Sequence, residues 1–334
     1  MKALKNFGPH DLRVVELSDP QPRPGAALIR VRASGICGSD KWYWTTGPTD
    51  FIAGHEVAGA VVAVGDGVTA LKPGDRVAVN NVVGCGACPA CSAGAFTRCP
   101  NRTGNDVNDG FCEYVVAPER NCLVLEPAVD YEAGCLVFDQ WGTPFAAVER
   151  GAVVAADAVA VTGLGPIGLG AVKCATLRGA RVIALDPVPY RREMALRLGA
   201  SAVLDPRAEG AVSALKDRTG GGPTVGIECS GNGKAYGLLL AALRPEGRLV
   251  SVGEHAEFTF HPSDDVIRKN LSILGSWYST MPQGAAVQRL MAQGALPAKA
   301  LVTHTVTLEE APSAFARAVE MADGVVKTVI LMPA

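Results

Sequence analysis

The chain has 334 residues, of which 48% are hydrophobic, and its 31 basic and 33 acidic side chains leave a net charge of −2. This length favours about two domains with large cores, and the balanced charge argues against a nucleic-acid-binding surface. No apolar run approaches the roughly 20 residues that span a bilayer. The N-terminal sequence MKALKNFGPH lacks the apolar core and cleavage site of a secretory signal. We therefore expect a cytoplasmic protein with reduced thiols that does not bind membranes.

The first 130 or so residues contain short segments that are rich in valine or alternate between apolar and polar residues. Turn-forming sequences such as PQPRPG, GDG and KPGD separate them. This pattern predicts β-strands at residues 27–34, 55–65, 75–82 and 112–118. Strands of this spacing are typical of a partly open β-barrel.

From about Gly151 the pattern changes to an apolar strand, a glycine turn and an amphipathic helix, repeated several times. Strands are predicted at residues 158–163, 181–186, 224–231, 247–253 and 271–276, and helices at 171–178, 191–198 and 237–243. Strands that alternate with helices in this way predict a doubly wound parallel sheet. The tail, residues 301–334, returns to strand, helix and strand, and we expect it to fold back onto the first domain.

Four cysteines fall within one stretch punctuated by glycine and proline, with the spacing C-x2-C-x2-C-x7-C. They are Cys85, Cys88, Cys91 and Cys99. Four thiolates satisfy the tetrahedral coordination of Zn²⁺ completely and leave no position open for chemistry. The spacing therefore predicts a structural zinc site that stabilises a lobe at about residues 84–100. The alternative, a disulfide cluster, is disfavoured by the expected reducing compartment.

A glycine motif of the form G-x-G-x-x-G follows the predicted strand at 158–163 and precedes a helix. It comprises Gly163, Gly165, Pro166, Ile167 and Gly168. Glycine at these positions permits a tight turn and close approach of the backbone to a pyrophosphate. Asp186 ends the next strand, 18 residues beyond the last glycine, where a carboxylate binds the adenosine ribose hydroxyls. An aspartate there favours NAD over NADP, although Arg191 and Arg192 nearby leave room for a 2′-phosphate. Alternatively, Asp186 only caps the following turn.

Two further fragments contain metal-binding residue types: Cys37 within CGSD, and His55 and Glu56 within GHEVAG. Together with the four-cysteine motif, the glycine motif and the KPGDRV turn, in this order, they resemble the zinc-dependent medium-chain dehydrogenases. The resemblance covers essentially the whole chain, from the MKAL start to the closing KTVIL segment. It implies a GroES-like β-barrel catalytic domain at residues 1–148 and 285–334, and a Rossmann dinucleotide-binding domain at 149–284.

The resemblance also implies a second, catalytic zinc site, and therefore two Zn²⁺ per chain. Its ligands would be Cys37 and His55, with Glu56 and Asp139 as candidates for the remaining position. Because catalytic zinc keeps an open position, these two carboxylates compete for one place. Asp40 matches the family carboxylate that holds the metal-bound histidine; its alternative role is to cap the following turn.

In the mechanism that the resemblance implies, a zinc-bound alcohol loses a hydride to the nicotinamide of NAD and becomes a carbonyl compound. Ser39 is expected to be the first proton relay, and Thr143 to lie near the nicotinamide. The cofactor-binding set is expected to comprise the glycine motif, Asp186, Arg191, Val252, Gly253 and Ser276. His255 is a further candidate for the same cleft. Relatives are usually homodimers or homotetramers.

The sequence departs from the family at Trp42, where relatives that act on polyols carry a histidine. A tryptophan cannot relay a proton through imidazole. Only 17 residues separate Cys37 from His55, and we interpret this short loop as widening the mouth of the cleft. The hypothesis that follows is a bulky substrate: a sugar, polyol, cyclitol or amino-sugar glycoside. Aromatic residues expected to contact it are Tyr43, Trp44, Trp141 and Trp277, although water exclusion and packing are equally good explanations for them.

Three alternatives remain. The chain could be a simple alcohol or aldehyde dehydrogenase of the same family. It could be a zinc-ribbon binding or sensor protein, although the cysteine lobe carries few of the basic residues that nucleic-acid binding needs. It could also be a zinc-free reductase, but retention of Cys37, His55, Glu56 and Asp139 argues against this.

Overall fold

The computed structural model describes residues 1–254 and 257–333, and His255 therefore lies outside the described residues. The chain divides into two units, Met1–Gly142 with Ser279–Ala334, and Thr143–Tyr278. Both boundaries fall six residues before those expected from the sequence. The expected boundaries would cut through helices α4 (Gly142–Arg150) and α9 (Met281–Ala292), whereas the observed ones lie at the first residue of α4 and two residues before α9.

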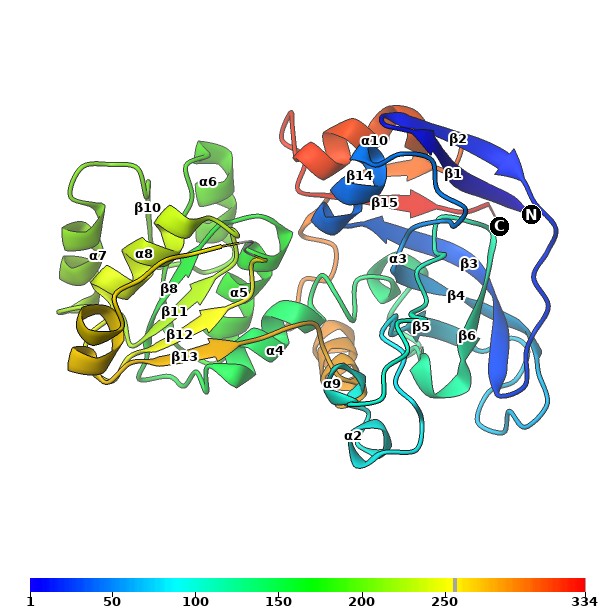
Figure 1. Ribbon diagram of the computed structural model, residues 1–334, viewed down its shortest axis with the longest axis horizontal. Helices are drawn as coiled ribbons and strands as arrows, with labels where there is room; N and C mark the ends of the chain where they lie inside the picture. Colours follow the sequence, from blue (N-terminus) through cyan, green and yellow to red (C-terminus); the bar gives the residue numbers. More distant parts are fainter. Residues whose placement is uncertain (255–256, 334) are drawn as a thin grey trace. The chain divides into compact units, whose positions relative to one another are not determined.

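The first unit is built on a seven-stranded sheet with the order β14-β15-β3-β4-β5-β7, in which β6 also pairs with β3 (Figure 1). All pairs are antiparallel except β14 with β15. The strands are β3 (Ala26–Ile36), β4 (Glu56–Val64), β5 (Arg76–Val79), β6 (Tyr114–Pro118), β7 (Cys122–Val124), β14 (Val302–Thr307) and β15 (Lys327–Leu331). Strand β15 pairs directly with β3, so the tail does fold back onto the first domain.

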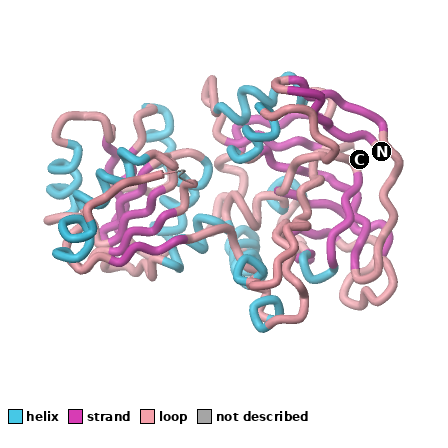
Figure 2. The backbone as a smooth tube through the Cα atoms, in the orientation of Figure 1, coloured by secondary structure: helices cyan, strands magenta, loops and turns pink. Residues whose placement is uncertain are grey.

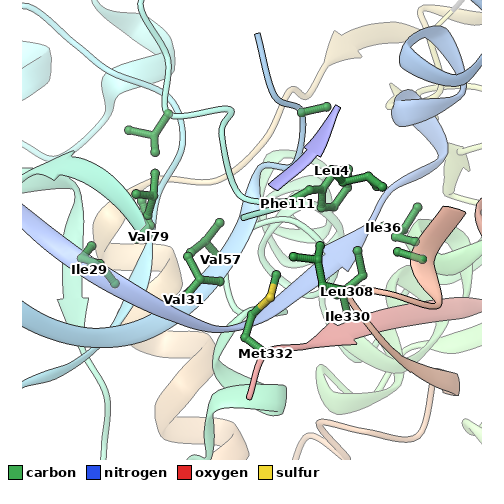
Figure 3. Close-up of a cluster of buried hydrophobic side chains, with 14 of the residues drawn as sticks. Leu4, Ile29, Val31, Ile36, Val57, Val79, Phe111, Leu308, Ile330 and Met332 are labelled. Atoms are coloured by element: carbon green, nitrogen blue, oxygen red, sulfur yellow. The ribbon is translucent and has the colours of Figure 1, made fainter. Parts of the chain in front are cut away.

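A separate antiparallel hairpin and several helices complete this unit. The hairpin is β1 (Lys2–Gly8) with β2 (Asp11–Glu16), and the helices are α1 (Lys41–Thr45), α2 (Pro89–Ser92), α3 (Tyr131–Gly134), α9, and α10 (Ala311–Glu320). Side chains that are far apart in the sequence form one apolar core, including Leu4, Val31, Val57, Phe111 and Ile330 (Figure 3). This core fixes the strands whose ends carry the candidate metal ligands.

The second unit contains a six-stranded, fully parallel sheet with the order β10-β9-β8-β11-β12-β13. Its elements are β8 (Ala158–Thr162), β9 (Arg181–Leu185), β10 (Ala202–Leu204), β11 (Val225–Glu228), β12 (Arg248–Ser251), β13 (Ser272–Gly275), α4, α5 (Pro166–Leu177), α6 (Pro189–Arg197), α7 (Ala211–Thr219) and α8 (Gly233–Ala242). Strands and helices alternate along this unit (Figure 2). The winding direction reverses between β8 and β11, which is the position where ligands bind in such sheets. The predicted doubly wound sheet is confirmed.

The longest helices are short compared with a membrane thickness. Within residues 1–254 and 257–333, no helix has the length and apolar character needed to cross a bilayer.

Candidate functional site

The four predicted ligands of the second metal site meet at one place in the first unit. Cys37 follows the last residue of β3, His55 and Glu56 stand at the start of β4, and Asp139 follows α3. Because Gly35 pairs with Glu56 in the antiparallel register, the end of β3 and the start of β4 are held side by side. One ligand atom from each of the four residues lies within 4.8 Å of the others.

His55 is held from both sides of its ring. Its Nε2 lies 3.1 Å from Asp139 Oδ2, and its Nδ1 lies 3.5 Å from Asp40 Oδ1. The second oxygen of Asp40 accepts a hydrogen bond of 2.8 Å from the Cys37 amide. Burial lowers the pKa of His55, but the charge of Asp40 and hydrogen bonds to Asp139 outweigh it and raise that pKa well above its usual value. Asp40 therefore contacts both Cys37 and His55. Its contact with Nδ1 orients the His55 ring so that Nε2 faces Asp139.

Glu56 forms a buried ion pair with Lys327 through its Oε1, and both side chains are almost fully buried. Its Oε2 has no hydrogen-bond partner among the described residues. Burial raises the pKa of Glu56 to about 7, against the opposing effect of Lys327. Lys327 was not predicted as a site residue. The one available signal was a lysine that opens the otherwise apolar strand KTVIL.

The donor set suits a divalent metal ion. A thiolate, an imidazole and carboxylates are the ligands that zinc takes in catalytic sites. When the thiol and the three carboxyl groups of Cys37, Asp40, Glu56 and Asp139 are ionised and His55 is neutral, the cation of Lys327 leaves a net charge of −3 in a buried cluster. A divalent ion offsets most of this charge. Buried charge is costly unless it is paired, and Glu56 Oε2, which accepts no hydrogen bond among the described residues, fits a cation bound in this cluster.

The four cysteines of the lobe also converge. Cys88 Sγ lies 3.5 Å from Cys91 Sγ and 3.7 Å from Cys99 Sγ, and Cys85 Sγ lies 4.0 Å from Cys91 Sγ. A tetrahedron with zinc–sulfur bonds of about 2.3 Å separates its sulfurs by about 3.8 Å, whereas a disulfide requires about 2.05 Å. All ten cysteines are free thiols. The lobe therefore has the geometry of a metal site with four sulfur ligands.

The glycine motif lies between β8 and α5, at the point where the sheet reverses its winding. Gly163 has φ +80°, and a side chain there would come within 2.6 Å of the Ser230 amide nitrogen. A Cβ on Gly168 would overlap the Gly163 carbonyl oxygen. Gly165 is the N-cap of α5, whose first residue is Pro166, followed by Ile167. Only glycine permits this tight connection.

Asp186, directly after β9, is buried and anchored by the glycine loop. Its Oδ2 accepts a 2.7 Å hydrogen bond from the Leu164 amide, and its Oδ1 accepts one of 2.8 Å from the Val188 amide. Arg191 Nη1 lies 3.9 Å from the carboxylate. Arg192 donates to the carbonyl oxygens of Asp186 and Pro187. Asp186 therefore both caps the turn that follows β9 and anchors the glycine loop.

The remaining cofactor candidates also lie where strands of the parallel sheet end. The amides of Val252 and Gly253 both donate to the Glu228 carbonyl at 2.9 Å, and the Ser276 amide donates to Ser251 at 3.0 Å. Thr143 is the second residue of α4 and is largely buried. In the first unit, Ser39 is exposed in the single turn between Cys37 and Asp40.

Two aromatic residues expected to contact substrate are instead core residues, which corrects the sequence prediction. Tyr43 is 1% exposed, and its hydroxyl donates to the Leu4 carbonyl. Trp141 is 0% exposed, and its Nε1 donates to the Ala298 carbonyl at 2.9 Å. The polar atoms of both side chains form hydrogen bonds within the protein, so the two rings form part of the core of the first unit.

The other two aromatic candidates are more accessible. Trp44 is partly buried and stacks on His10, with ring centroids 5.0 Å apart, while it also contacts Phe315. Trp277 is 52% exposed and belongs to the second unit. Trp42, which replaces the family histidine, is 60% exposed and stacks in parallel on Phe51.

Comparison with known proteins agrees with this geometry. Residues 166–293 match the zinc-binding dehydrogenase family, and residues 23–127 match the GroES-like domain of alcohol dehydrogenases. An uncharacterised zinc-type alcohol dehydrogenase-like protein of Escherichia coli is 35% identical over 92% of this chain and 91% of its own length. Sorbitol dehydrogenase of Bacillus subtilis is 31% identical over 99% of this chain and 97% of its own.

A solved structure extends the similarity to three dimensions. A putative zinc-binding dehydrogenase from Sinorhizobium meliloti, bound to NADP, has a TM-score of 0.88 and 29% identity, over 99% of this chain and 98% of its own. The resemblance and the fold class predicted from the motifs are thereby confirmed. The chain belongs to the zinc-dependent medium-chain dehydrogenase/reductase family, and it is an oxidoreductase of the kind that acts on alcohols and polyols.

Proposed function

We propose that this protein oxidises a secondary alcohol of a sugar, polyol, cyclitol or amino-sugar glycoside to a ketone, or catalyses the reverse reaction, with NAD as cofactor. In the forward direction the carbinol C–H bond breaks and its hydride passes to the nicotinamide, while the hydroxyl proton leaves to solvent. The proposal includes two zinc ions per chain, one catalytic and one structural, and a homodimeric or homotetrameric assembly.

The observation that carries this proposal is the meeting of Cys37, His55, Glu56 and Asp139, whose ligand atoms lie within 4.8 Å of one another. Zinc held there supplies a Lewis acid that lowers the pKa of an alcohol hydroxyl. A thiolate, an imidazole and one carboxylate leave the fourth position for substrate. A second, four-sulfur group in the same unit suits the structural ion, because it leaves no such position.

Of the two competing carboxylates, the contacts favour Asp139 as the third ligand. Asp139 Oδ2 lies 3.1 Å from His55 Nε2, the ring nitrogen that Asp40 leaves available for a metal. Glu56 already directs one oxygen to Lys327. We therefore assign Cys37, His55 and Asp139 as the metal ligands, with Asp40 as the residue that orients the imidazole.

Ser39 supports the expected route for the proton. It lies two residues after Cys37 in an exposed turn, so its hydroxyl can pass a proton to water without a buried relay. Trp42, three residues further on, has no group that accepts a proton. We propose that solvent or the cofactor ribose completes the path that an imidazole completes in relatives.

The surroundings of Asp186 support NAD as the cofactor. The carboxylate is held in place by two backbone amides, and it would repel a 2′-phosphate. Arg192 is engaged by the carbonyl oxygens of Asp186 and Pro187. Replacing Asp186 with serine should weaken NAD binding by about tenfold and narrow the preference over NADP. Fluorescence titration with NADH and NADPH checks this, and an unchanged ratio of the two dissociation constants contradicts the assignment.

Similarity to sorbitol dehydrogenase and the aromatic surface of the first unit support a polyhydroxylated substrate. Trp42 and Phe51 are 60% and 47% exposed, and their rings lie parallel with centroids 6.1 Å apart. Such faces suit the apolar faces of sugar rings. Both residues lie on the 17-residue segment between Cys37 and His55.

The test is NAD reduction measured against a panel of polyols, cyclitols, amino sugars and glycosides, with ethanol and 2-butanol as the simple alcohols. We expect kcat/KM for at least one polyhydroxylated secondary alcohol to exceed that for ethanol by two or more orders of magnitude. Equal turnover of ethanol and the best polyol removes the substrate proposal but leaves the dehydrogenase assignment intact.

A further inference from the structure

The third candidate metal ligand, Asp139, lies outside the strand pairing that holds the other ligands. The pairing of β3 with β4 fixes the segments that carry Cys37 and His55 relative to each other. Asp139 instead belongs to residues 135–141, which form turns between α3 and α4. Its Oδ2 nevertheless lies 3.1 Å from His55 Nε2, so other contacts must fix this turn segment at the metal site.

These contacts come from the part of the chain that returns to the first unit at Ser279. Ser279 Oγ donates a hydrogen bond of 2.6 Å to the carbonyl oxygen of Phe138, the residue directly before Asp139. A Cβ on Gly284 of α9 would overlap the Phe138 ring, so α9 packs directly against this ring. Because Ser279 and Phe138 are each only 2% exposed, water does not compete for the hydrogen bond between them.

Ser279 is itself held on its other side. Its carbonyl oxygen accepts a hydrogen bond of 3.1 Å from Nδ2 of Asn80, a side chain that is 0% exposed. Asn80 directly follows β5, whose last residue, Val79, pairs with Val57 near the start of β4. Asn121 Nδ2 donates to the Asn80 carbonyl oxygen at 2.7 Å and so fixes this position further. Ser279 therefore connects the strand next to β4 with the turn segment that carries the third ligand.

The place of the Ser279 hydroxyl is also fixed by space. A Cβ added to Gly142 would lie 2.4 Å from Ser279 Oγ and 2.8 Å from the Val137 carbonyl oxygen. The φ angle of Gly142 is one that other residues adopt, so glycine is needed there to leave room rather than to permit a turn. The hydroxyl fills this room and reaches the Phe138 carbonyl from it.

We propose that Ser279 is a positioning residue for the catalytic metal. Its hydroxyl, bonded to Phe138, and its carbonyl, bonded to Asn80, together set the place of the Asp139 carboxylate relative to His55. The inference rests on the proposed function, since it assumes a metal to which Asp139 is a ligand. Ser279 acts through the backbone beside this ligand, in the way that neighbours which orient ligands tune a metal site.

The first test is Ser279→Ala, which removes the hydrogen bond to the Phe138 carbonyl. Competition with a chelator should show that the affinity of the catalytic site for zinc falls about tenfold. The ion of the four-cysteine site is the internal control and should be unaffected. In cobalt-substituted protein, the visible absorption of the catalytic ion should shift, because these bands report the arrangement of its ligands. A folded Ser279→Ala protein with unchanged affinity and an unchanged cobalt spectrum would overturn the proposal.

A double variant shows whether Ser279 acts through Asp139. Asp139→Ala alone should weaken zinc binding at the catalytic site, because it removes a ligand. If Ser279 only positions that ligand, adding Ser279→Ala to Asp139→Ala should change the remaining affinity by no more than about twofold. General damage to the site would instead add the same loss in either background. A further fall of about tenfold in the double variant would therefore overturn the proposal.

Ser34→Ala is the matched control. Ser34 lies in β3 of the same unit and is 0% exposed, and its Oγ has no hydrogen-bond partner among the described residues. The substitution deletes the same buried atom without breaking a hydrogen bond, so zinc affinity should equal that of the wild type. Equal losses in Ser34→Ala and Ser279→Ala would overturn the proposal, because the hydrogen bond would then not be their cause.

Asn80→Asp tests the same connection without changing Ser279, and it serves if Ser279→Ala does not fold. The aspartate keeps the oxygen that accepts from the Val82 amide, but it replaces the nitrogen that donates to Ser279. Zinc affinity at the catalytic site should fall by about three- to tenfold, with the four-cysteine site unaffected. A folded Asn80→Asp protein with wild-type affinity would overturn the proposal.

Failure of the proposed function gives a different result. If the wild-type protein binds no metal beyond the four-cysteine site, or if Cys37→Ser leaves the second ion in place, the assignment of the catalytic metal is wrong. If Cys37→Ser and Asp139→Ala both weaken binding of the second ion while Ser279→Ala does not, only the positioning role is wrong.

Discussion

The first unit contains two clusters of potential metal ligands that differ in how the chain brings them together. Cys85, Cys88, Cys91 and Cys99 lie within 15 residues, and all four donors are sulfur. The other cluster collects a thiol, an imidazole and two carboxylates from positions that span residues 37–139. The first is a local structure that its own turns can form. The second exists only when β3, β4 and the segment after α3 are folded together.

The two clusters also differ in what surrounds them. The four-cysteine lobe reaches the surface, where Cys85 is exposed, and sulfur is its only ligand type. Around the mixed cluster, Asp40 and Lys327 each hold one of its members by a charged contact. Charged neighbours of this kind orient the ligands of a metal site. The comparison predicts that one metal is structural and the other exchangeable.

The largest effect should follow from Cys37→Ser. Loss of the thiolate removes the catalytic metal, so kcat/KM should fall by at least about 1,000-fold, equivalent to ~4 kcal/mol of transition-state stabilisation. NAD binding and the metal of the four-cysteine lobe should be nearly unchanged. Steady-state kinetics, NADH titration and metal analysis check these three points. Retained activity would mean that the mixed cluster is not the catalytic centre.

Cys88→Ser should affect stability rather than chemistry. Losing one ligand of a closed four-cysteine site should lower the free energy of unfolding by about 3 kcal/mol and the Tm by about 10 °C. Calorimetry of the wild type and the variant measures the shift. A stable variant that keeps its Tm would break the distinction between the clusters, because the lobe would then need no metal to fold.

Asp40→Asn should weaken the mixed cluster without emptying it. The asparagine keeps a similar shape but loses the charge that orients His55, so metal affinity at this site should fall about 10–100-fold. Competition with a chelator measures this affinity, and the metal of the four-cysteine lobe is the internal control. Equal losses at both sites would indicate general destabilisation.

A smaller effect is expected in the thiol chemistry of the metal-free protein. Backbone hydrogen bonds, chiefly from Ala87, lower the pKa of Cys85 to about 6, whereas burial raises the pKa of Cys37. A lowered pKa means that Cys85 is already a thiolate above about pH 6, so its alkylation rate should level off near pH 7. Cys37 should react slowly until alkaline pH. Mass spectrometry after iodoacetamide treatment distinguishes the two, and faster labelling of Cys37 at pH 7 contradicts the prediction.

How far the sequence predicts each cluster follows from the same difference. The spacing of four cysteines between glycine and proline turns is sufficient to predict their convergence, because short-range turns bring them together. The glycine motif and Asp186 are likewise recognisable, since a strand, a loop and a helix follow one another directly. Cys37, His55 and Asp139 could be grouped only through the family resemblance, because long-range strand pairing brings them together.

Some of the site was not predictable in this way. Lys327 lies 271 residues beyond Glu56 in the sequence. No local sequence pattern predicts that β15 pairs with β3 and so brings Lys327 close to Glu56. Tyr43 and Trp141 were expected to contact substrate because their segments flank ligands, but their rings turn into the core. The position of Tyr43 and Trp141 in the sequence correctly placed them near the metal ligands. The direction in which each side chain points depends on packing against strands that are distant in the sequence.

The most direct test of this account is metal content followed during chelation. Purified protein should contain about two zinc ions per chain. A chelator should remove one of them first, with loss of dehydrogenase activity but no loss of folded structure by circular dichroism, and added zinc should restore the activity. A protein with a single zinc ion per chain, or one that keeps full activity after the first ion has left, would contradict the account.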